Sequence, residues 1–83
     1  MATKIRVVRN GTPVTDVHVL VGELVGERLK TNAEGKVSFD LTLDWQGYVN
    51  VLLELPEGIN ATALVHIKEG KTHDVDVATL PQA

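Results

Sequence analysis

The sequence predicts an all-β fold, an antiparallel sandwich of about seven strands, from three observations. Apolar and polar residues alternate with a period of two over several stretches, and no stretch has helical periodicity. Turns that contain Gly or Pro separate these stretches at intervals of about 8–12 residues. The apolar residues are mainly valine and leucine, and the β-branched valine favours strands.

The alternation is clearest from Val37 to Asp44, where the odd positions are apolar and the even positions are polar. A strand with this pattern places all its apolar side chains on one face. Five further runs follow the same rule, and a seventh, weaker strand is expected over about residues 26–31. The apolar residues of the five runs are Ile5 and Val7; Val17, Val19 and Val21; Val49, Val51, Leu53 and Leu55; Ala61, Ala63, Val65 and Ile67; and Val75 and Val77.

Only a few residues separate the last two of these runs, so we expect the two strands to form a hairpin. A two-residue turn would place His66 opposite His73, but it would also put Val65 on the same face as Asp74. A three-residue loop with Gly70 in the left-handed conformation keeps the apolar side chains together. We therefore expect the bulged loop, with the two histidines on opposite faces of the hairpin.

Length and composition limit the classes of function. A chain of 83 residues forms one domain, residues 1–83, with 43% apolar and 23% charged residues. A net charge of −3 argues against a nucleic-acid partner, which requires a basic surface. The absence of cysteine excludes disulfides and zinc–thiolate sites, and no apolar run is long enough for a membrane span. No secretory signal is recognisable, so the cellular location stays open between a cytoplasmic, a phage-borne and an excised secreted protein.

Two segments carry a family resemblance: residues 10–19, NGTPVTDVHV, and residues 31–39, TNAEGKVSF. Together with Gly47-Tyr48-Val49-Asn50-Val51 they resemble the carboxypeptidase regulatory-like domain, a relative of the transthyretin sandwich. Bacterial Ig-like repeats share the first two elements, so the resemblance implies a transthyretin-like or an Ig-like topology. Trp45-Gln46 departs from the family, because a Pro-Gly turn is usual at this place.

The resemblance also bears on catalysis. The related hydroxyisourate hydrolases use His and Arg residues and a C-terminal Tyr-Arg-Gly-Ser, whereas this chain ends in Leu80-Pro81-Gln82-Ala83. His18, His66 and His73 stand in no matching motif, and isolated histidines on strands are usually structural or solvated. Asp40, Thr42 and Asp44 share one polar strand face, but calcium sites gather their oxygen ligands in a loop. We therefore expect no enzyme, no cofactor and no metal.

The candidate binding residues are Asp44, Trp45, Gln46 and Tyr48. The chain's single Trp and single Tyr stand beside one turn, and both types favour interfaces because they offer large, stiff surfaces with a polar tip. A second interpretation is that Trp45 closes the open end of the aliphatic core. A third is that the aromatic rings stack on a sugar.

The sequence thus predicts a non-catalytic structural or protein-interaction module. Its partner would be another protein or a second copy, bound through a sheet edge or through the Trp45 loop. The alternative function is a carbohydrate-binding module that uses Trp45 and Tyr48.

Overall fold

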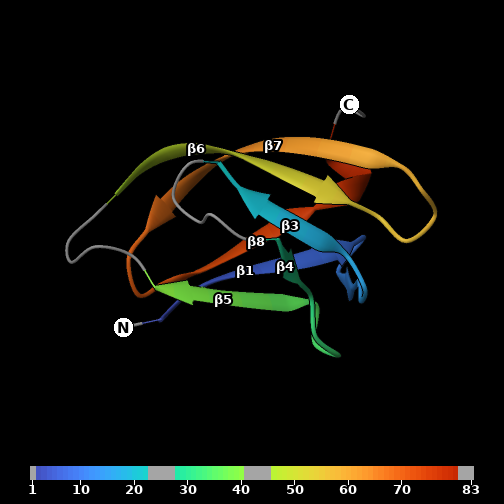
Figure 1. Cartoon of the computed structure of the whole chain (residues 1–83), viewed down its shortest axis with the longest axis horizontal. Helices are drawn as coiled ribbons and strands as arrows, with labels where there is room; N and C mark the ends of the chain where they lie inside the picture. Colours follow the sequence, from blue (N-terminus) through green and yellow to red (C-terminus); the bar gives the residue numbers. More distant parts are fainter. Residues whose placement is uncertain (1, 23–27, 41–45, 81–83) are drawn as a thin grey trace.

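The alternating runs form two four-stranded sheets that pack face to face (Figure 1). The structure, a computed structural model, describes residues 2–22, 28–40 and 46–80. The prediction of an all-β sandwich is confirmed. The first sheet contains β1 (Ala2–Arg9), β2 (Thr12–Pro13), β5 (Lys36–Asp40) and β8 (Thr72–Asp76); the second has the order β4 (Leu29–Lys30), β3 (His18–Val21), β6 (Gln46–Glu54) and β7 (Asn60–Lys68).

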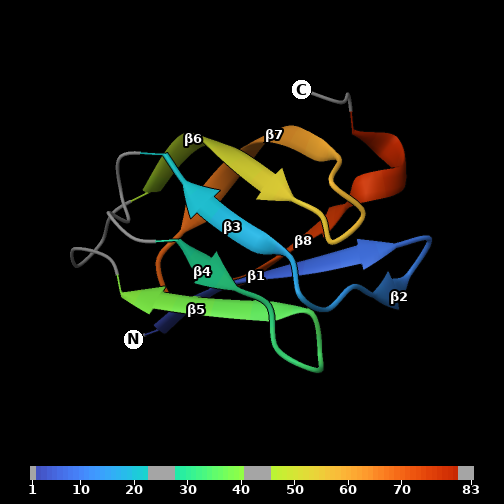
Figure 2. The same cartoon turned by 45° about the vertical axis from the view of Figure 1, so that its right-hand side comes forward.

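Strand β1 is the centre of the first sheet. β5 and β2 pair with the same edge of β1, one after the other along its length. Val7 lies between them: its amide donates to the Gly35 carbonyl before β5, and its carbonyl, on the same side of β1, accepts from the Val14 amide after β2. β8 lies along the opposite edge, in register from Lys4↔Thr72 to Val8↔Asp76 (Figure 2). This pair is parallel, so the sandwich is not antiparallel throughout.

The predicted hairpin between the last two runs is wrong. Gly70 does adopt the left-handed conformation, with φ +78°, but β7 and β8 belong to different sheets. The turn that joins them bonds to β1 instead: the Gly70 amide donates to Thr3 Oγ1 at 3.0 Å, and the Lys4 amide donates to the Lys71 carbonyl at 3.0 Å. These bonds carry the chain across to the first sheet, where β8 pairs with β1.

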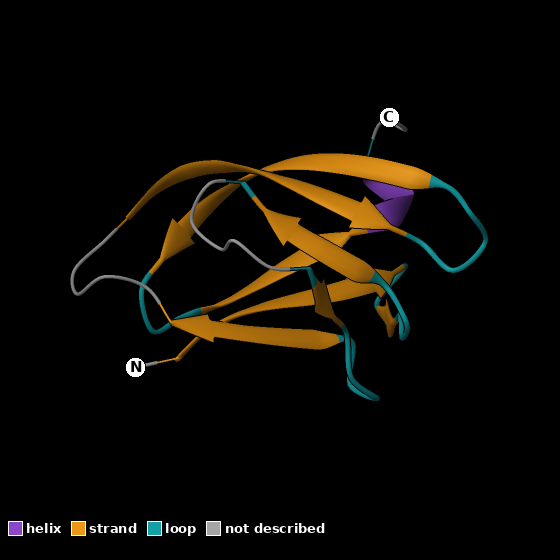
Figure 3. Cartoon of the chain, viewed as in Figure 1, coloured by secondary structure: helices purple, strands orange, loops and turns teal. Residues whose placement is uncertain are grey.

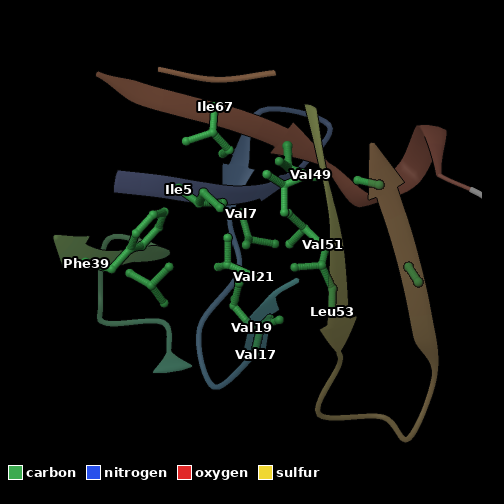
Figure 4. Packing of buried hydrophobic residues seen from close by; sticks show 14 of the residues in the cluster. Ile5, Val7, Val17, Val19, Val21, Phe39, Val49, Val51, Leu53 and Ile67 are labelled. Atoms are coloured by element: carbon green, nitrogen blue, oxygen red, sulfur yellow. The ribbon is translucent and has the colours of Figure 1, made fainter. Parts of the chain in front are cut away.

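The core lies between the sheets, and among the residues that the structure describes it is aliphatic except for Phe39. Figure 4 shows Ile5, Val7 and Phe39 of the first sheet with the valines of β3 and β6. Ser38 and Asp40 are exposed, as the alternation predicts, and residues 41–44 of that run lie outside the described residues. Val65 is only partly buried, unlike the other inward residues of β7. Val77 was expected in the last strand but begins a 3-10 turn, Val77–Thr79, drawn in purple in Figure 3.

Two local motifs hold the strands in place. Asn10 and Gly11 both have positive φ, +50° and +84°, which gives the tight turn between β1 and β2 the twist that hairpins require. Asn32 Oδ1 accepts from the amides of Glu34 and Lys36, at 2.9 and 3.0 Å, and so forms the turn before β5.

Candidate functional site

The candidate site is the free edge of β7 and the outer face beside it. The other sheet edges carry features that discourage strand pairing: β4 has two residues, β2 contains Pro13, β5 bears Lys36 and Asp40, and β8 bears Asp74 and Asp76. β7 has nine residues, and no proline or charged residue lies between Asn60 and His66. Within the described part of the chain, β7 pairs with β6 only.

The ladder between β6 and β7 determines which backbone groups of β7 face outward. The Leu55 amide donates to the Ile59 carbonyl at 2.9 Å, in the same register as the strand pairs from Glu54↔Asn60 to Gln46↔Lys68. Odd-numbered residues of β7 therefore bond to β6, because bonded and non-bonded pairs alternate in an antiparallel ladder. Even-numbered residues direct their N–H and C=O groups to the free edge: Asn60, Thr62, Leu64, His66 and Lys68. The amide of Lys68 donates to His73 Nε2 at 2.9 Å, which confirms its outward direction.

The side chains of the same even-numbered residues form the outer face of the second sheet. Leu64 is 66% exposed and Tyr48, on β6, is 69% exposed. Tyr48 lies opposite His66, and their rings are 4.8 Å apart between centroids with a 46° tilt. Leu20 and Leu52, which pair across β3 and β6, are partly exposed on this face too. An apolar surface thus borders an open strand edge, which is the arrangement a docking strand needs.

The structure places the predicted binding residues as follows. Tyr48 belongs to the exposed outer face, at the end of β6 where the strand begins. Gln46 opens β6 opposite Lys68. Asp44 and Trp45 lie outside the described residues, so the three interpretations of Trp45 stay predictions.

The histidines stand in three different strands. His18 on β3 pairs with Lys30 and Glu54, and His66 pairs with Tyr48. His73 on β8 is engaged on both ring nitrogens, with the Lys68 amide at Nε2 and the Lys4 carbonyl 3.1 Å from Nδ1. Across residues 2–22, 28–40 and 46–80, no three His, Asp or Glu side chains are grouped in a way that could hold a metal ion.

A shallow depression of about 580 Å³ lies at the β1–β2 turn, lined by Arg9, Asn10, Pro13 and Pro56 among others. The Arg9 guanidinium there donates to Glu57 Oε1 at 2.6 Å. The hydrogen bond from Arg9 lowers the pKa of Glu57, and a backbone hydrogen bond of Glu57 lowers it further. Because Glu57 already pairs with the Arg9 cation that lines the depression, the depression is a weaker candidate binding site than the edge of β7.

Comparison of the chain with known protein families gives no match, and comparison with curated proteins gives none either. No helix in the described residues is long and apolar enough to cross a membrane.

The sequence did not single out β7 as the free edge. Its alternation identifies the inward residues Ala61 and Ile67, but an alternating pattern is the same in an edge strand and a central one. The available signal is the absence of charge from Asn60 to His66, which stands out against the charged strands β5 and β8.

Proposed function

We propose that the protein is a non-catalytic structural or protein-interaction module of the carboxypeptidase regulatory-like type, and that it binds a partner strand along β7. The open edge of β7 is the observation that carries this proposal. Outward N–H and C=O groups at Asn60, Thr62, Leu64 and His66 would form a ladder with an extended partner segment.

The adjoining face supplies selectivity. Backbone bonds in strand addition are independent of the partner's sequence, so preference for one partner comes from side chains. The exposed rings of Tyr48 and His66 and the side chain of Leu64 offer apolar contact beside the ladder. Aromatic residues at such positions contribute much of the binding energy in protein interfaces.

Two structural features support the family assignment within this proposal. Immunoglobulin constant-type domains place their first, second, fourth and fifth strands in one sheet. If the two-residue β2 is set aside, this chain places the first, fourth and seventh strands together: β1, β5 and β8. This distribution differs from the constant-type Ig arrangement, which is why we keep the transthyretin-like alternative of the resemblance in the proposal. Two residues that carry the resemblance bond to neighbouring backbone: the Thr31 hydroxyl donates to the Val14 carbonyl, and the Gly35 carbonyl accepts from the Val7 amide.

The test is selection of extended peptides against the immobilised chain, followed by NMR mapping of the bound peptide. We expect perturbed amides at Thr62, Leu64 and His66. Thr62→Pro removes one outward N–H and should therefore weaken peptide binding at least about tenfold. The substitution leaves the bonds from the odd-numbered residues of β7 to β6 in place, so β7 should stay in the sheet. Thr62→Val keeps the N–H and is the matched control. Selected peptides that bind equally well to Thr62→Pro would contradict the proposal.

A carbohydrate-binding function is the second candidate, because the Tyr48 ring is 69% exposed. Aromatic rings on a sheet face can stack on a sugar ring. A glycan array distinguishes the two functions: a glycan signal lost in Tyr48→Ala and in Trp45→Ala, but kept in Thr62→Pro, would favour the carbohydrate module. A screen with 5-hydroxyisourate tests the non-catalytic part of the proposal, and turnover above the uncatalysed rate would contradict it.

A further inference from the structure

We infer that the strand bound by β7 is β7 of a second copy of this chain, paired antiparallel about a two-fold axis at Ala63. This inference rests on the proposed function and names its partner. The occupant follows from three properties of the open edge: its charge, its register and the size of its side chains.

The charge of the edge permits self-pairing. In a symmetric pair two identical strand edges face each other, so a charged residue on the edge can lie close to the same charge on the second copy. Asn60, Thr62 and Leu64 are uncharged, and the segment from Asn60 to His66 contains no Lys, Arg, Asp or Glu. The nearest charged side chain of β7, Lys68, has its outward amide already bonded to His73. The open segment, from Asn60 to His66, therefore ends before Lys68, the charged residue of β7.

One register uses every open position of both copies. The outward groups belong to even-numbered residues, so bonded pairs across the new interface must join even to even. If Asn60 pairs with His66 of the second copy, Thr62 pairs with Leu64, and all four open residues of each strand are bonded. Shifting the strands by two residues in either direction leaves part of each open segment unpaired.

The side chains at the axis fit this register. Odd-numbered residues form the non-bonded pairs, in which Cα atoms approach to about 4.5 Å. Ala63 would then face Ala63 of the second copy, and its small side chain suits this close approach. Ala61 would face Val65 of the second copy, which is partly buried in the single chain, and would cover part of its side chain. On the outer face the two Leu64 side chains meet diagonally over the axis, which would reduce the exposure of a side chain that is 66% exposed in the single chain.

A single-cysteine experiment tests the register directly, because the chain contains no cysteine of its own. In Ala63→Cys the two thiols face each other at a Cα separation within the disulfide range, about 4.4–6.8 Å. In Ala61→Cys, on the same strand and face, the two thiols are four residues apart along the interface, or about 14 Å. Under mild oxidation we expect Ala63→Cys to form the covalent dimer at least about tenfold faster than Ala61→Cys.

Sedimentation equilibrium of the unaltered chain provides the second measurement, and we expect a concentration-dependent dimer. Leu64→Lys places two like charges over the axis and should raise the dimer dissociation constant at least about tenfold. Thr15→Lys adds the same charge at an exposed residue outside the sheet edge and should leave it unchanged.

The outcomes separate this inference from the proposed function. A chain that stays monomeric, with equal cross-linking of both cysteine variants, overturns the self-pairing. If that monomer still binds selected strand peptides in a manner sensitive to Thr62→Pro, the proposed function stands and only its partner is wrong. If it binds none, both are wrong. Faster cross-linking of Ala61→Cys overturns the Ala63 register.

Discussion

Gly35 lies against the backbone of Val7 so closely that a Cβ atom at Gly35 would stand 2.6 Å from the Val7 carbonyl oxygen. The Val7 amide also donates to the Gly35 carbonyl at 2.7 Å, so neither strand can move away without losing a bond. With φ +75°, Gly35 is moreover in a conformation that side chains rarely adopt. We expect Gly35→Ala to lower the free energy of unfolding by about 2 kcal/mol or more.

Gly58→Ala is the matched control for this prediction. Gly58 has φ +84°, but no atom lies within 4 Å of the Cβ that a substitution would add. Its replacement should cost only the conformational strain, about 1 kcal/mol. Urea unfolding of both variants measures the difference, and equal losses would show that the contact with Val7 has no energetic consequence.

Thr31 satisfies two backbone groups beside the core. Its hydroxyl accepts from the Val17 amide at 3.0 Å and donates to the Val14 carbonyl at 3.0 Å, and the residue is 5% exposed. Thr31→Val preserves the shape but leaves the buried Val17 amide without that acceptor. We expect a loss of about 1–3 kcal/mol in unfolding free energy. Thr31→Ser retains the hydroxyl and should lose less; a larger loss in Thr31→Ser would contradict this account.

His73 links the β7–β8 turn to β1 through both ring nitrogens. An amide N–H can only donate, so Nε2 of His73 accepts from Lys68 and Nδ1 must carry the hydrogen that is donated to the Lys4 carbonyl. Nitrogen-15 NMR of the neutral imidazole should therefore show the Nδ1-protonated tautomer. His73→Ala should lower stability by about 1 kcal/mol, whereas His66→Ala, at the Tyr48 pair, leaves this link intact. An Nε2-protonated ring at His73 would exclude the two bonds.

The Arg9–Glu57 ion pair gives a testable pH dependence. The hydrogen bond from Arg9 lowers the pKa of Glu57 below its ordinary value of 4.5. A carboxylate whose pKa is lowered by folding stabilises the protein at pH values above its unfolded pKa. This contribution is lost as the pH falls through the folded pKa. In an NMR titration of the carboxyl groups, Arg9→Gln should raise the pKa of Glu57 toward 4.5. An unchanged titration of Glu57 would mean that the pair does not form in solution.

The sequence predicts the strands well because their inward residues are governed by one local rule. Val37 and Phe39 are buried while Ser38 and Asp40 are exposed, as a period of two requires. The turn at Asn10-Gly11 was likewise predictable, since these residue types tolerate positive φ.

The pairing of the strands was harder to predict, because alternation identifies a strand's buried face but not its neighbour. The short link Lys68–Lys71 suggests a hairpin. Instead, the Gly70 amide donates to Thr3 of β1, and His73 joins the Lys68 amide to the Lys4 carbonyl, so that the turn is bound to β1 and β8 belongs to the other sheet. The free edge of β7 follows from that same crossing. A contact between residues 67 positions apart, such as Gly70 with Thr3, leaves no local signature in the sequence.

The parallel pairing of β1 with β8 also constrains biosynthesis. Ribosomes deliver β1 first, yet one whole side of this strand, from Lys4 to Val8, receives its partner only when Thr72–Asp76 has been made. Until then its unsatisfied amides and carbonyls remain available to wrong strands, including those of neighbouring nascent chains. We expect this sandwich to fold slowly for its size, because closing the contact between β1 and β8 requires most of the residues between Lys4 and Asp76 to be ordered at once.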